Sequence, residues 1–450
     1  MSDWLIQRFS DFGERSFLAF GDETTPYRTL HDQVEAYIGE LTQAGVQNGE
    51  VVTLIGDYSL NGIAALLAIF RIKAIAAPVA TGAASEADSR SREAQAQWQL
   101  EVGEAFRLTR LEPPQERHAY LEQLREKRKA GLILFSSGST GRPKAMIHDA
   151  DRLLEPFRKK RARKHRILIF LLFDHIGGLN TLFNALATGA LMVVPHSRDA
   201  DVVAKAIEQH KVNLLPASPT FLNLLLISGA PRQYDLSSLR FITYGTEPMP
   251  ESLLHRIKEA LPNVSLLQTF GTSETGISQT VSRASDSTLI KFEGSESEYK
   301  IVEGELWIRS KNQVLGYLNH AMDRFTEDGW FRTGDLVEEA EDGFIKIIGR
   351  REDLINVGGE KVTPSEVESV LLEISEVIDC LVYGEENAIT GQNVAAKIVA
   401  GKDQDLKQLK RAIKKHCRAK LSAYKVPARI SFIDQTTFSA RFKKTRGEQA

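Results

Sequence analysis

The sequence has few cysteines, almost no excess of either charge and no long apolar run, and each of these absences excludes a class of protein. The two cysteines, Cys380 and Cys417, are too few to form the disulfide framework of a small secreted domain. They favour a reducing compartment. The 57 basic and 59 acidic residues give a net charge of −2, so we expect no nucleic acid as a partner. Apolar stretches such as 167–173 have the length of a strand and are too short to cross a bilayer.

The start of the chain also lacks the pattern of a secretory signal. Met1 is followed by Ser2, Asp3 and Trp4 rather than by basic residues and an apolar core. We therefore expect a cytoplasmic protein with no integral membrane segment. Its 450 residues exceed the size of one ordinary domain and predict two.

Alternating strand-like and helix-like patterns predict an α/β fold with a large N-terminal domain of layered sheets and helices. Residues 51–55, 77–80 and 131–135 are short apolar runs typical of buried strands. Residues 61–73 carry apolar side chains at helical spacing between the first two of these runs.

Past residue 349 the predicted units become shorter. Helices are predicted at 365–374 and 405–421, the second of them strongly basic, and a strand is predicted at 377–383. About 100 residues of this kind suffice for a small α+β domain.

A segment rich in glycine and hydroxyl groups follows the predicted strand at 131–135. It reads Ser136-Ser137-Gly138-Ser139-Thr140-Gly141-Arg142-Pro143-Lys144. Glycines let backbone N–H groups approach a polyphosphate closely, and the hydroxyls and the lysine supply donors and positive charge. The order differs from a Walker loop, in which Gly-Lys-Ser/Thr follows a four-residue gap. A polar hairpin turn is the alternative interpretation.

Three further segments carry residues suited to a nucleotide. In 268–274, Phe270 could stack on a base and Glu274 could bind Mg²⁺, although a capped turn at a strand end is the alternative. In 330–335, Asp335 follows a tight turn and could bind two ribose hydroxyls. The fourth segment begins with Gly349-Arg350-Arg351-Glu352-Asp353 and continues to residue 368.

In this order and at this spacing, the four segments resemble the adenylate-forming (ANL) superfamily of acyl-CoA synthetases, nonribosomal peptide adenylation domains and luciferases. The resemblance extends from about Tyr27 to Arg446. It implies an N-terminal ATP- and acid-binding domain, 1–351, and a mobile C-terminal domain, 352–450, with the active site between them. It also implies a reaction in two steps: ATP and a small carboxylic acid form an acyl-adenylate, and a thiol then takes the acyl group.

The resemblance implies a role for each matching residue. The loop around the ATP phosphates would comprise Ser136, Ser137, Gly138, Ser139, Thr140, Gly141 and Lys144, of which Thr140 and Lys144 would be catalytic. Thr246, Glu247 and Pro248 would line the adenine, with Phe270 on the face of its ring, and Gly271, Thr272 and Ser273 would also bind the cofactor. Asp335 and Arg350 would hold the ribose, Glu274 would hold Mg²⁺ and take part in catalysis, and Glu352 would be the hinge.

The resemblance further implies a C-terminal lysine that contacts the α-phosphate and the carboxylate during adenylation. The family pattern is Gly-Lys with an arginine three residues after the lysine. Aligning 432–434 and Arg446 places this lysine at Lys443, with Phe442 in place of the glycine. Lys444 is a close alternative, and a merely basic tail is another.

The predicted acid pocket departs from the family pattern. Asp174, His175 and Gly178 lie where the family has Phe-His-x-x-Gly, so that Asp174 replaces an aromatic residue. A buried Asp174 could meet the amine of an amino-acid substrate. Alternatively, it could be a solvated or backbone-bonded residue at a strand end.

Three functions are consistent with these patterns. The first is a ligase that makes an acyl-CoA from ATP, an acid and coenzyme A. The second is a stand-alone adenylation enzyme that loads a carrier-protein phosphopantetheine. The third is a non-catalytic nucleotide-binding protein, suggested only by Phe442. The basic segment 158–166 is interpreted as a solvated helix face.

Overall fold

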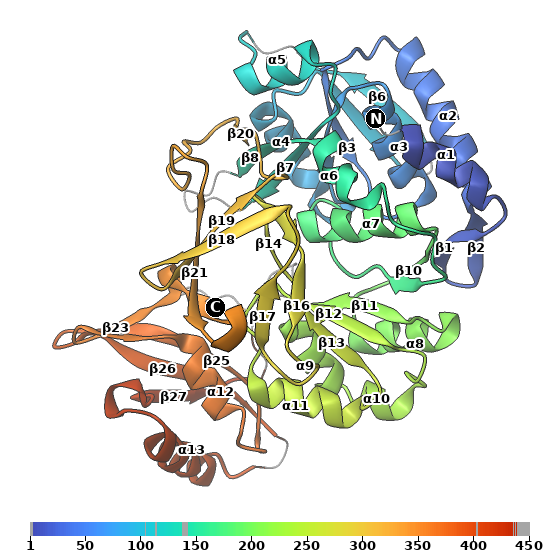
Figure 1. The fold of residues 1–450 in the computed structure, drawn as a ribbon. Helices are drawn as coiled ribbons and strands as arrows, with labels where there is room; N and C mark the ends of the chain where they lie inside the picture. The colour runs from blue at the N-terminus through green and yellow to red at the C-terminus, as the bar shows by residue number, and fades with distance from the viewer. Residues whose placement is uncertain are drawn as a thin grey trace.

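The computed structural model describes residues 3–103, 105–112, 115–136, 143–401, 404–434, 436 and 438. In Figure 1 these residues form an upper lobe, a second lobe at the lower right, antiparallel strands between them and a C-terminal unit at the lower left. The predicted α/β class, with a large N-terminal and a small C-terminal domain, is confirmed. Among the described helices, none combines the length and the apolar composition needed to span a membrane.

The upper lobe is built on a seven-stranded sheet. Its strands, in order across the sheet, are β20 (Gly316–Tyr317), β8 (Lys144–Asp149), β7 (Gly131–Ser136), β4 (Ile75–Val79), β3 (Val51–Ile55), β5 (Trp98–Val102) and β6 (Phe106–Arg110). Alternate residues of the inner strands enter two hydrophobic clusters, one on each face. Both faces are thus buried, which explains the continuous apolar runs of β3 and β4.

Helices cover both faces of this sheet. One face packs on α3 (Leu60–Arg71), which is buried along nearly its whole length, and the other on α4 (Ala87–Glu93) and α5 (Ala119–Glu126). The helices α1 (Asp3–Phe12) and α2 (Tyr27–Gln43) extend the α3 side, and α6 (Ala150–Leu154) follows β8.

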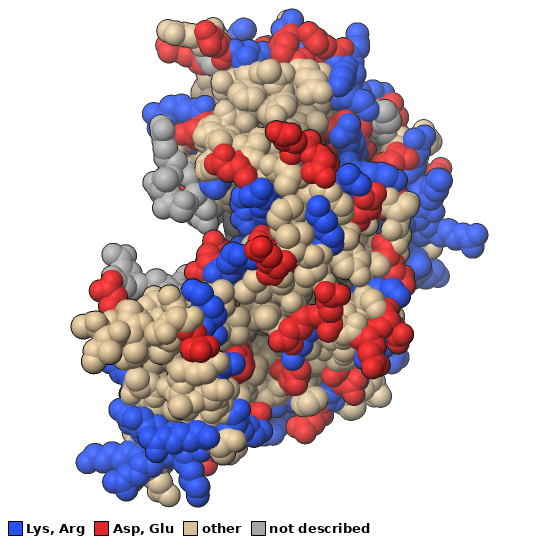
Figure 2. Space-filling view, turned by 60° about the vertical axis from the view of Figure 1, so that its left-hand side comes forward, with Lys and Arg blue, Asp and Glu red and all other residues tan. Residues whose placement is uncertain are grey.

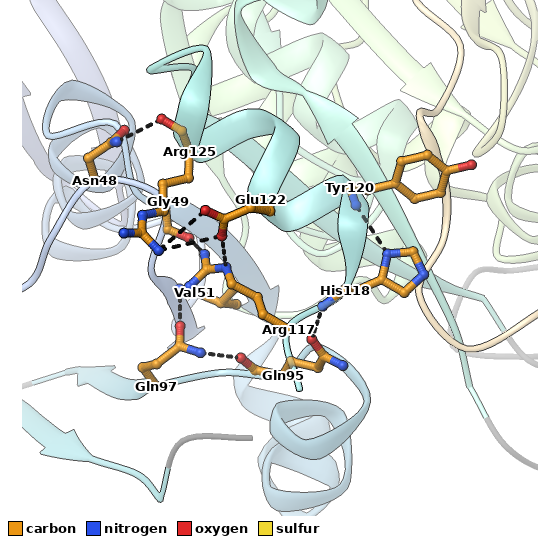
Figure 3. A network of polar contacts seen from close by, with 10 residues as sticks. All are labelled: Asn48, Gly49, Val51, Gln95, Gln97, Arg117, His118, Tyr120, Glu122 and Arg125. Atoms are coloured by element: carbon orange, nitrogen blue, oxygen red, sulfur yellow. Dashed lines mark hydrogen bonds and ion pairs between the residues drawn. The ribbon is translucent and has the colours of Figure 1, made fainter. Parts of the chain in front are cut away.

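A polar network fixes α5 to the turn that precedes β3 (Figure 3). The side chain of Asn48 donates to the carbonyl of Arg125 at 2.9 Å, and Arg117 donates to the carbonyl of Gly49. A Cβ at Gly49 would lie 2.5 Å from the Arg125 side chain, and the φ of Gly49 is +80°. Only glycine fits there, because the position requires both the close approach and the left-handed backbone.

The second lobe has another seven-stranded sheet. Its order is β13 (Ser265–Gln268), β12 (Phe241–Tyr244), β11 (Leu214–Ala217), β9 (Arg166–Leu168), β10 (Leu191–Val194), β1 (Ser16–Phe20) and β2 (Glu23–Pro26). One face packs on α8 (Ala200–His210), α9 (Pro219–Ile227), α10 (Ala230–Gln233) and α11 (Glu251–Ala260). On the other face α7 (Ile176–Thr188) lies between the two lobes and shares a core with α3.

An antiparallel six-stranded sheet and a short hairpin join these lobes. The sheet has the order β16 (Thr280–Ser282), β17 (Leu289–Phe292), β22 (Ile345–Arg350), β21 (Phe331–Glu339), β19 (Glu305–Ser310) and β18 (Ser297–Val302). The hairpin pairs β14 (Phe270–Thr272) with β15 (Gly276–Ser278).

The C-terminal unit has a hydrophobic core of its own. Every buried member of this core comes from Ile355 or later in the chain. The strands are β24 (Glu360–Val362), β23 (Ile355–Val357), β26 (Gly391–Ala400), β25 (Val377–Asn387) and β27 (Arg429–Phe432), with α12 (Pro364–Leu371) and α13 (Leu406–Lys420) packed on them. The boundary between 351 and 352 stays a prediction.

Candidate functional site

The predicted phosphate loop connects two paired strands, and its ends are firmly held. Ser136 on β7 lies opposite Lys144 on β8, and both residues are half-buried. Asn319 donates to the carbonyl of Pro143 at 2.8 Å and accepts the N–H of Ala145 at 2.9 Å. Sequence reasoning missed Asn319, which fixes the backbone on both sides of Lys144.

The remaining members of that loop lie outside the described residues: Ser137, Gly138, Ser139, Thr140 and Gly141. The same is true of both candidate lysines at the C-terminus, Lys443 and Lys444. Their roles stay predictions from the sequence.

The two segments predicted to bind adenine lie side by side. The N–H of Thr269 donates to the carbonyl of Tyr244 at 2.7 Å, and a Cβ at Gly245 would lie 2.6 Å from the carbonyl oxygen of Thr269. Thr246 is exposed and has a φ of +75°, a conformation that non-glycine residues rarely adopt. The segments 244–248 and 268–274 therefore meet at the carboxyl ends of the neighbouring parallel strands β12 and β13, where open α/β sheets bind ligands.

Within these segments, two side chains also have structural partners. Glu247 accepts the N–H of Thr220 at 2.7 Å, in the first turn of α9, where a carboxylate is favoured by the helix dipole. Phe270 is only 7% exposed, and its ring packs edge-on against Phe292 with centroids 5.7 Å apart. Adenine stacking on Phe270 stays a prediction. A stacked adenine would have to share the ring of Phe270 with its contact to Phe292.

Glu274, the predicted Mg²⁺ ligand, is oriented by a buried tyrosine. The hydroxyl of Tyr317 donates to Oε1 of Glu274 at 3.1 Å. Burial and the negative charge of Glu274 raise the pKa of Tyr317 above its ordinary value, so this hydroxyl keeps its proton. Carboxylate oxygens are the ligands that Mg²⁺ prefers, and Mg²⁺ commonly takes one or two of them together with substrate phosphates. Glu274 fits that requirement.

The predicted ribose and hinge residues form one chain of ion pairs. Asp335 on β21 lies opposite Arg350 on β22, and Nε of Arg350 donates to Oδ1 of Asp335 at 3.1 Å. The same guanidinium donates through Nη1 to Oε1 of Glu352 at 3.2 Å. Burial alone would lower the pKa of Arg350, but Asp335 and Glu352 together raise it above its ordinary value.

Asp174 is buried and paired with an arginine from the other lobe. Its Oδ2 accepts Nη1 of Arg90 at 2.8 Å, and the two side chains are 10% and 12% exposed. Arg90 also binds Glu86 through two nitrogens, and its guanidinium lies 5.4 Å from the ring centroid of Phe135. Phe135 precedes Ser136, so Arg90 connects the start of the predicted phosphate loop to Asp174. Neither interpretation of Asp174 from the sequence included this cation.

Further polar groups surround the pair. The carboxylate of Asp57 accepts the N–H of Tyr58 at 2.9 Å and the hydroxyl of Thr81 at 3.2 Å. Burial raises the pKa of Asp57, these two hydrogen bonds oppose the shift, and the positive charge of Arg198 opposes it further. Arg198 in turn interacts electrostatically with both Asp57 and Asp174. With Glu86, which also binds Arg90, three carboxylates share the two guanidinium groups of this cluster.

His175 and Gly178 both have local structural roles at the start of α7. Nδ1 of His175 accepts the N–H of Gly177 at 3.3 Å and caps the helix. A Cβ at Gly178 would lie 2.0 Å from the carbonyl oxygen of Leu172 and 2.4 Å from the hydroxyl of Tyr58. Gly178 is therefore required by backbone packing, whether or not it also lines a pocket.

Comparison with known families and structures gives matches over almost the whole chain. Residues 6–318 match the AMP-binding enzyme family, and residues 366–446 match the AMP-binding enzyme C-terminal domain. Curated relatives include the 2-succinylbenzoate–CoA ligase of Bacillus cereus (strain Q1), 27% identical over 487 aligned positions that cover 100% of this chain and 98% of the relative. The corresponding ligase of Bacillus pumilus is 28% identical, with 99% and 96% covered.

Two solved structures share the fold. One is the anthranilate CoA ligase AuaEII in complex with anthranoyl-AMP, with a TM-score of 0.84 and 22% identity over 98% of this chain and 95% of that chain. The other is the o-succinylbenzoate CoA synthetase of Bacillus subtilis with its acyl-adenylate intermediate, with a TM-score of 0.76 and 23% identity over 99% and 97%.

Proposed function

Because the chain belongs to the family of AMP-binding enzymes, we propose that it activates a carboxylic acid with ATP and transfers the acyl group to coenzyme A. The observation that carries this proposal is the family match over 6–318, followed by the family's C-terminal domain over 366–446. The enzyme is an AMP-forming ligase of the acid–CoA type, and its first step releases pyrophosphate.

The chemistry explains why such a site needs donors and cations rather than a general base. The acid is already ionised near neutral pH, so its carboxylate attacks the α-phosphorus of ATP without losing a proton. Because two anions must meet, catalysis depends on positioning and on neutralising charge in the transition state. In this proposal Lys144, Thr140 and Lys443 supply that charge and those donors. Mg²⁺, held by Glu274, neutralises phosphate charge when it is bound.

The acid that we propose is an aromatic carboxylic acid without a charged amine. Two observations support this: the relatives are named for 2-succinylbenzoate and anthranilate, both aromatic acids, and the carboxylate of Asp174 already has Arg90 as an ion-pair partner. An amine on the substrate would find no unpaired carboxylate at Asp174. A carrier-protein phosphopantetheine is the alternative acceptor for the acyl group.

The products of the reaction test the proposal. With ATP, Mg²⁺ and a panel of aromatic, aliphatic and amino acids, we expect acid-dependent formation of AMP and pyrophosphate, followed by a thioester when CoA is added. Chromatography of the nucleotides separates AMP from ADP. Formation of ADP and phosphate would contradict the proposal, and an acid-free reaction is the control.

Replacing Glu274 by glutamine should weaken adenylation by raising the Mg²⁺ concentration needed for half-maximal activity. The reason is that a neutral amide is a poorer ligand for a hard cation than a carboxylate. ATP–pyrophosphate exchange, titrated with Mg²⁺, measures this. Glu293→Gln, at an exposed site after β17, is the matched control. An unchanged Mg²⁺ titration in Glu274→Gln rules out the metal role.

Replacing Asp335 by alanine should mainly raise the KM for ATP, by about tenfold or more, because a hydrogen bond to a charged group is lost. The KM for the acid should change little. Since Asp335 also pairs with Arg350, the melting temperature must be followed in parallel to separate binding from stability. Asp328→Ala, at an exposed position in the turn before β21, is the control. Equal changes in both KM values would argue against a ribose contact.

A further inference from the structure

The last helix of the described chain, α13, presents an unusually uniform charge to solvent. Its fifteen residues include seven lysines and arginines and no acidic residue. Figure 2 shows blue side chains gathered at the base of the lower-left lobe, where α13 lies in Figure 1, whereas red and blue are mixed over the rest of this face. We propose that this helix is the docking surface for an acidic segment of a protein partner.

The orientation of α13 is fixed by its apolar residues. Leu409, Ile413 and Cys417 recur at a spacing of four and are buried in the core of the C-terminal unit. The opposite side carries what we call the α13 basic face, which consists of Lys407, Arg411, Lys414, Lys415 and Arg418. These positions follow each other at intervals of one, three or four residues and therefore share one stripe, about 16 Å long.

No acidic side chain of the described residues neutralises this face. Glu373 is the carboxylate that binds α13, and it is engaged by Lys420 at 2.6 Å and His416 at 2.8 Å, which lie outside the stripe. Lys410, also outside it, donates to the carbonyl of Ile430 at 3.0 Å. The five members of the α13 basic face make no ion pair with any described residue.

Helix stability does not account for this composition. Like charges four residues apart, such as Lys407 with Arg411 and Lys414 with Arg418, destabilise a helix. The helix dipole favours cations only in the last turn, which covers Arg418 but neither Lys407 nor Arg411. A bound anionic surface would relieve the repulsion that the isolated helix retains.

The extent of the stripe favours an acidic protein segment over a membrane or a nucleic acid. The apolar residues of α13 are used in the core, so the helix has no apolar face to insert into a bilayer. Without α13 the chain has 57 − 7 = 50 basic and 59 acidic residues, a net charge of −9. A plane or polymer of negative charge that reached beyond the stripe would meet the acidic side chains that Figure 2 shows mixed with basic ones over the rest of this face.

Binding of poly-L-glutamate to the full-length protein, followed by fluorescence anisotropy, tests the proposal. We expect binding that weakens with added NaCl, because exposed charges are screened. The triple variant Arg411→Gln/Lys415→Gln/Arg418→Gln should bind at least about tenfold more weakly, since three exposed ion pairs are lost. Its acid-dependent ATP–pyrophosphate exchange should stay at the wild-type level, which shows that it folds and keeps the proposed function.

A matched control uses the other basic segment. Lys159→Gln/Arg161→Gln/Lys164→Gln removes the same charge from exposed positions and should leave the binding of poly-L-glutamate unchanged. Equal weakening in both triple variants, or no binding by the wild type, would overturn the proposal. Tighter binding to phosphatidylserine vesicles or to duplex DNA than to poly-L-glutamate, lost in the α13 variant, would also overturn it in favour of a membrane or a nucleic acid.

Discussion

Replacing Lys443 by alanine should lower acid-dependent ATP–pyrophosphate exchange by at least about 10²-fold. That is the usual cost of removing one preorganised group that stabilises charge in a transition state. The same variant should convert a chemically supplied acyl-adenylate to the thioester at close to the normal rate. This separation is expected because the C-terminal domain, which the family resemblance implies is mobile, would carry Lys443 away from the site before the thiol attacks.

Lys444→Ala is the control for the alignment. If Lys444→Ala alone shows the adenylation defect, the roles of the two lysines must be exchanged. An equal loss of both half-reactions in Lys443→Ala would count against a rotation of the small domain.

Glu352→Pro should show the opposite pattern, in which adenylation survives and thioester formation is lost. Proline fixes φ at the predicted hinge and restricts the residue before it. Glu352→Gln separates this effect from the contact with Arg350, because it weakens the ion pair without restricting the backbone. A hinge defect in Glu352→Gln as large as that in Glu352→Pro would assign the effect to the ion pair instead.

Removing Arg90 from its pair with Asp174 should cost about 3–5 kcal/mol of unfolding free energy, because the carboxylate of Asp174 stays buried without this partner. Removing Asp174 should cost less, because Arg90 keeps its contacts with Glu86. Arg90→Met and Asp174→Leu remove one partner each, and the double variant removes both. Since a buried ion pair has a large desolvation penalty, the double variant should be more stable than the sum of the single effects implies. Urea denaturation of all three proteins measures the coupling.

A surface pair in the same lobe provides the control. Arg107 and Glu101 lie on β6 and β5 at 3.0 Å, with 73% and 52% of their side chains exposed. Arg107→Gln and Glu101→Gln should each cost at most about 1 kcal/mol. Losses of that small size in Arg90→Met and Asp174→Leu would show that the pair is not a stabilising link. Loss of amino acids as substrates in Asp174→Leu would restore the amine-binding interpretation of Asp174.

Local apolar patterns predicted the elements that are buried on both faces. The run 51–55 coincides with β3, and the predictions at 61–73 and 77–80 fall within two residues of α3 and β4. The apolar stretch 167–173 has the length of a strand, but only its first two residues belong to one, since β9 ends at Leu168. Phe170 and Phe173 enter two different hydrophobic clusters, so the chain crosses between cores. An apolar run has the same appearance in a strand and in such a crossing.

The motifs located the candidate site, but their partners could not be predicted. Arg90 lies 84 residues from Asp174, Tyr317 lies 43 residues from Glu274, and Asn319 lies 174 residues from Ala145. Each contact depends on how two sheets or two strands meet, and no periodicity in one sequence carries that information. Residue types that suit ATP binding can be recognised in short stretches of sequence. The residues that hold them in place can be identified only in the folded structure.

The lack of space at Gly178 sets a rule for redesigning the acid specificity of this enzyme. Any side chain there would collide with the carbonyl of Leu172, and backbone cannot move aside as a flexible side chain can. A substitution would have to displace α7, whose apolar residues are buried in the hydrophobic core that it shares with α3, so it would change folding before it changed substrate choice. A library of variants intended to change the acid substrate should therefore keep glycine at position 178. It should vary residues whose side chains point away from the contact between Gly178 and Leu172.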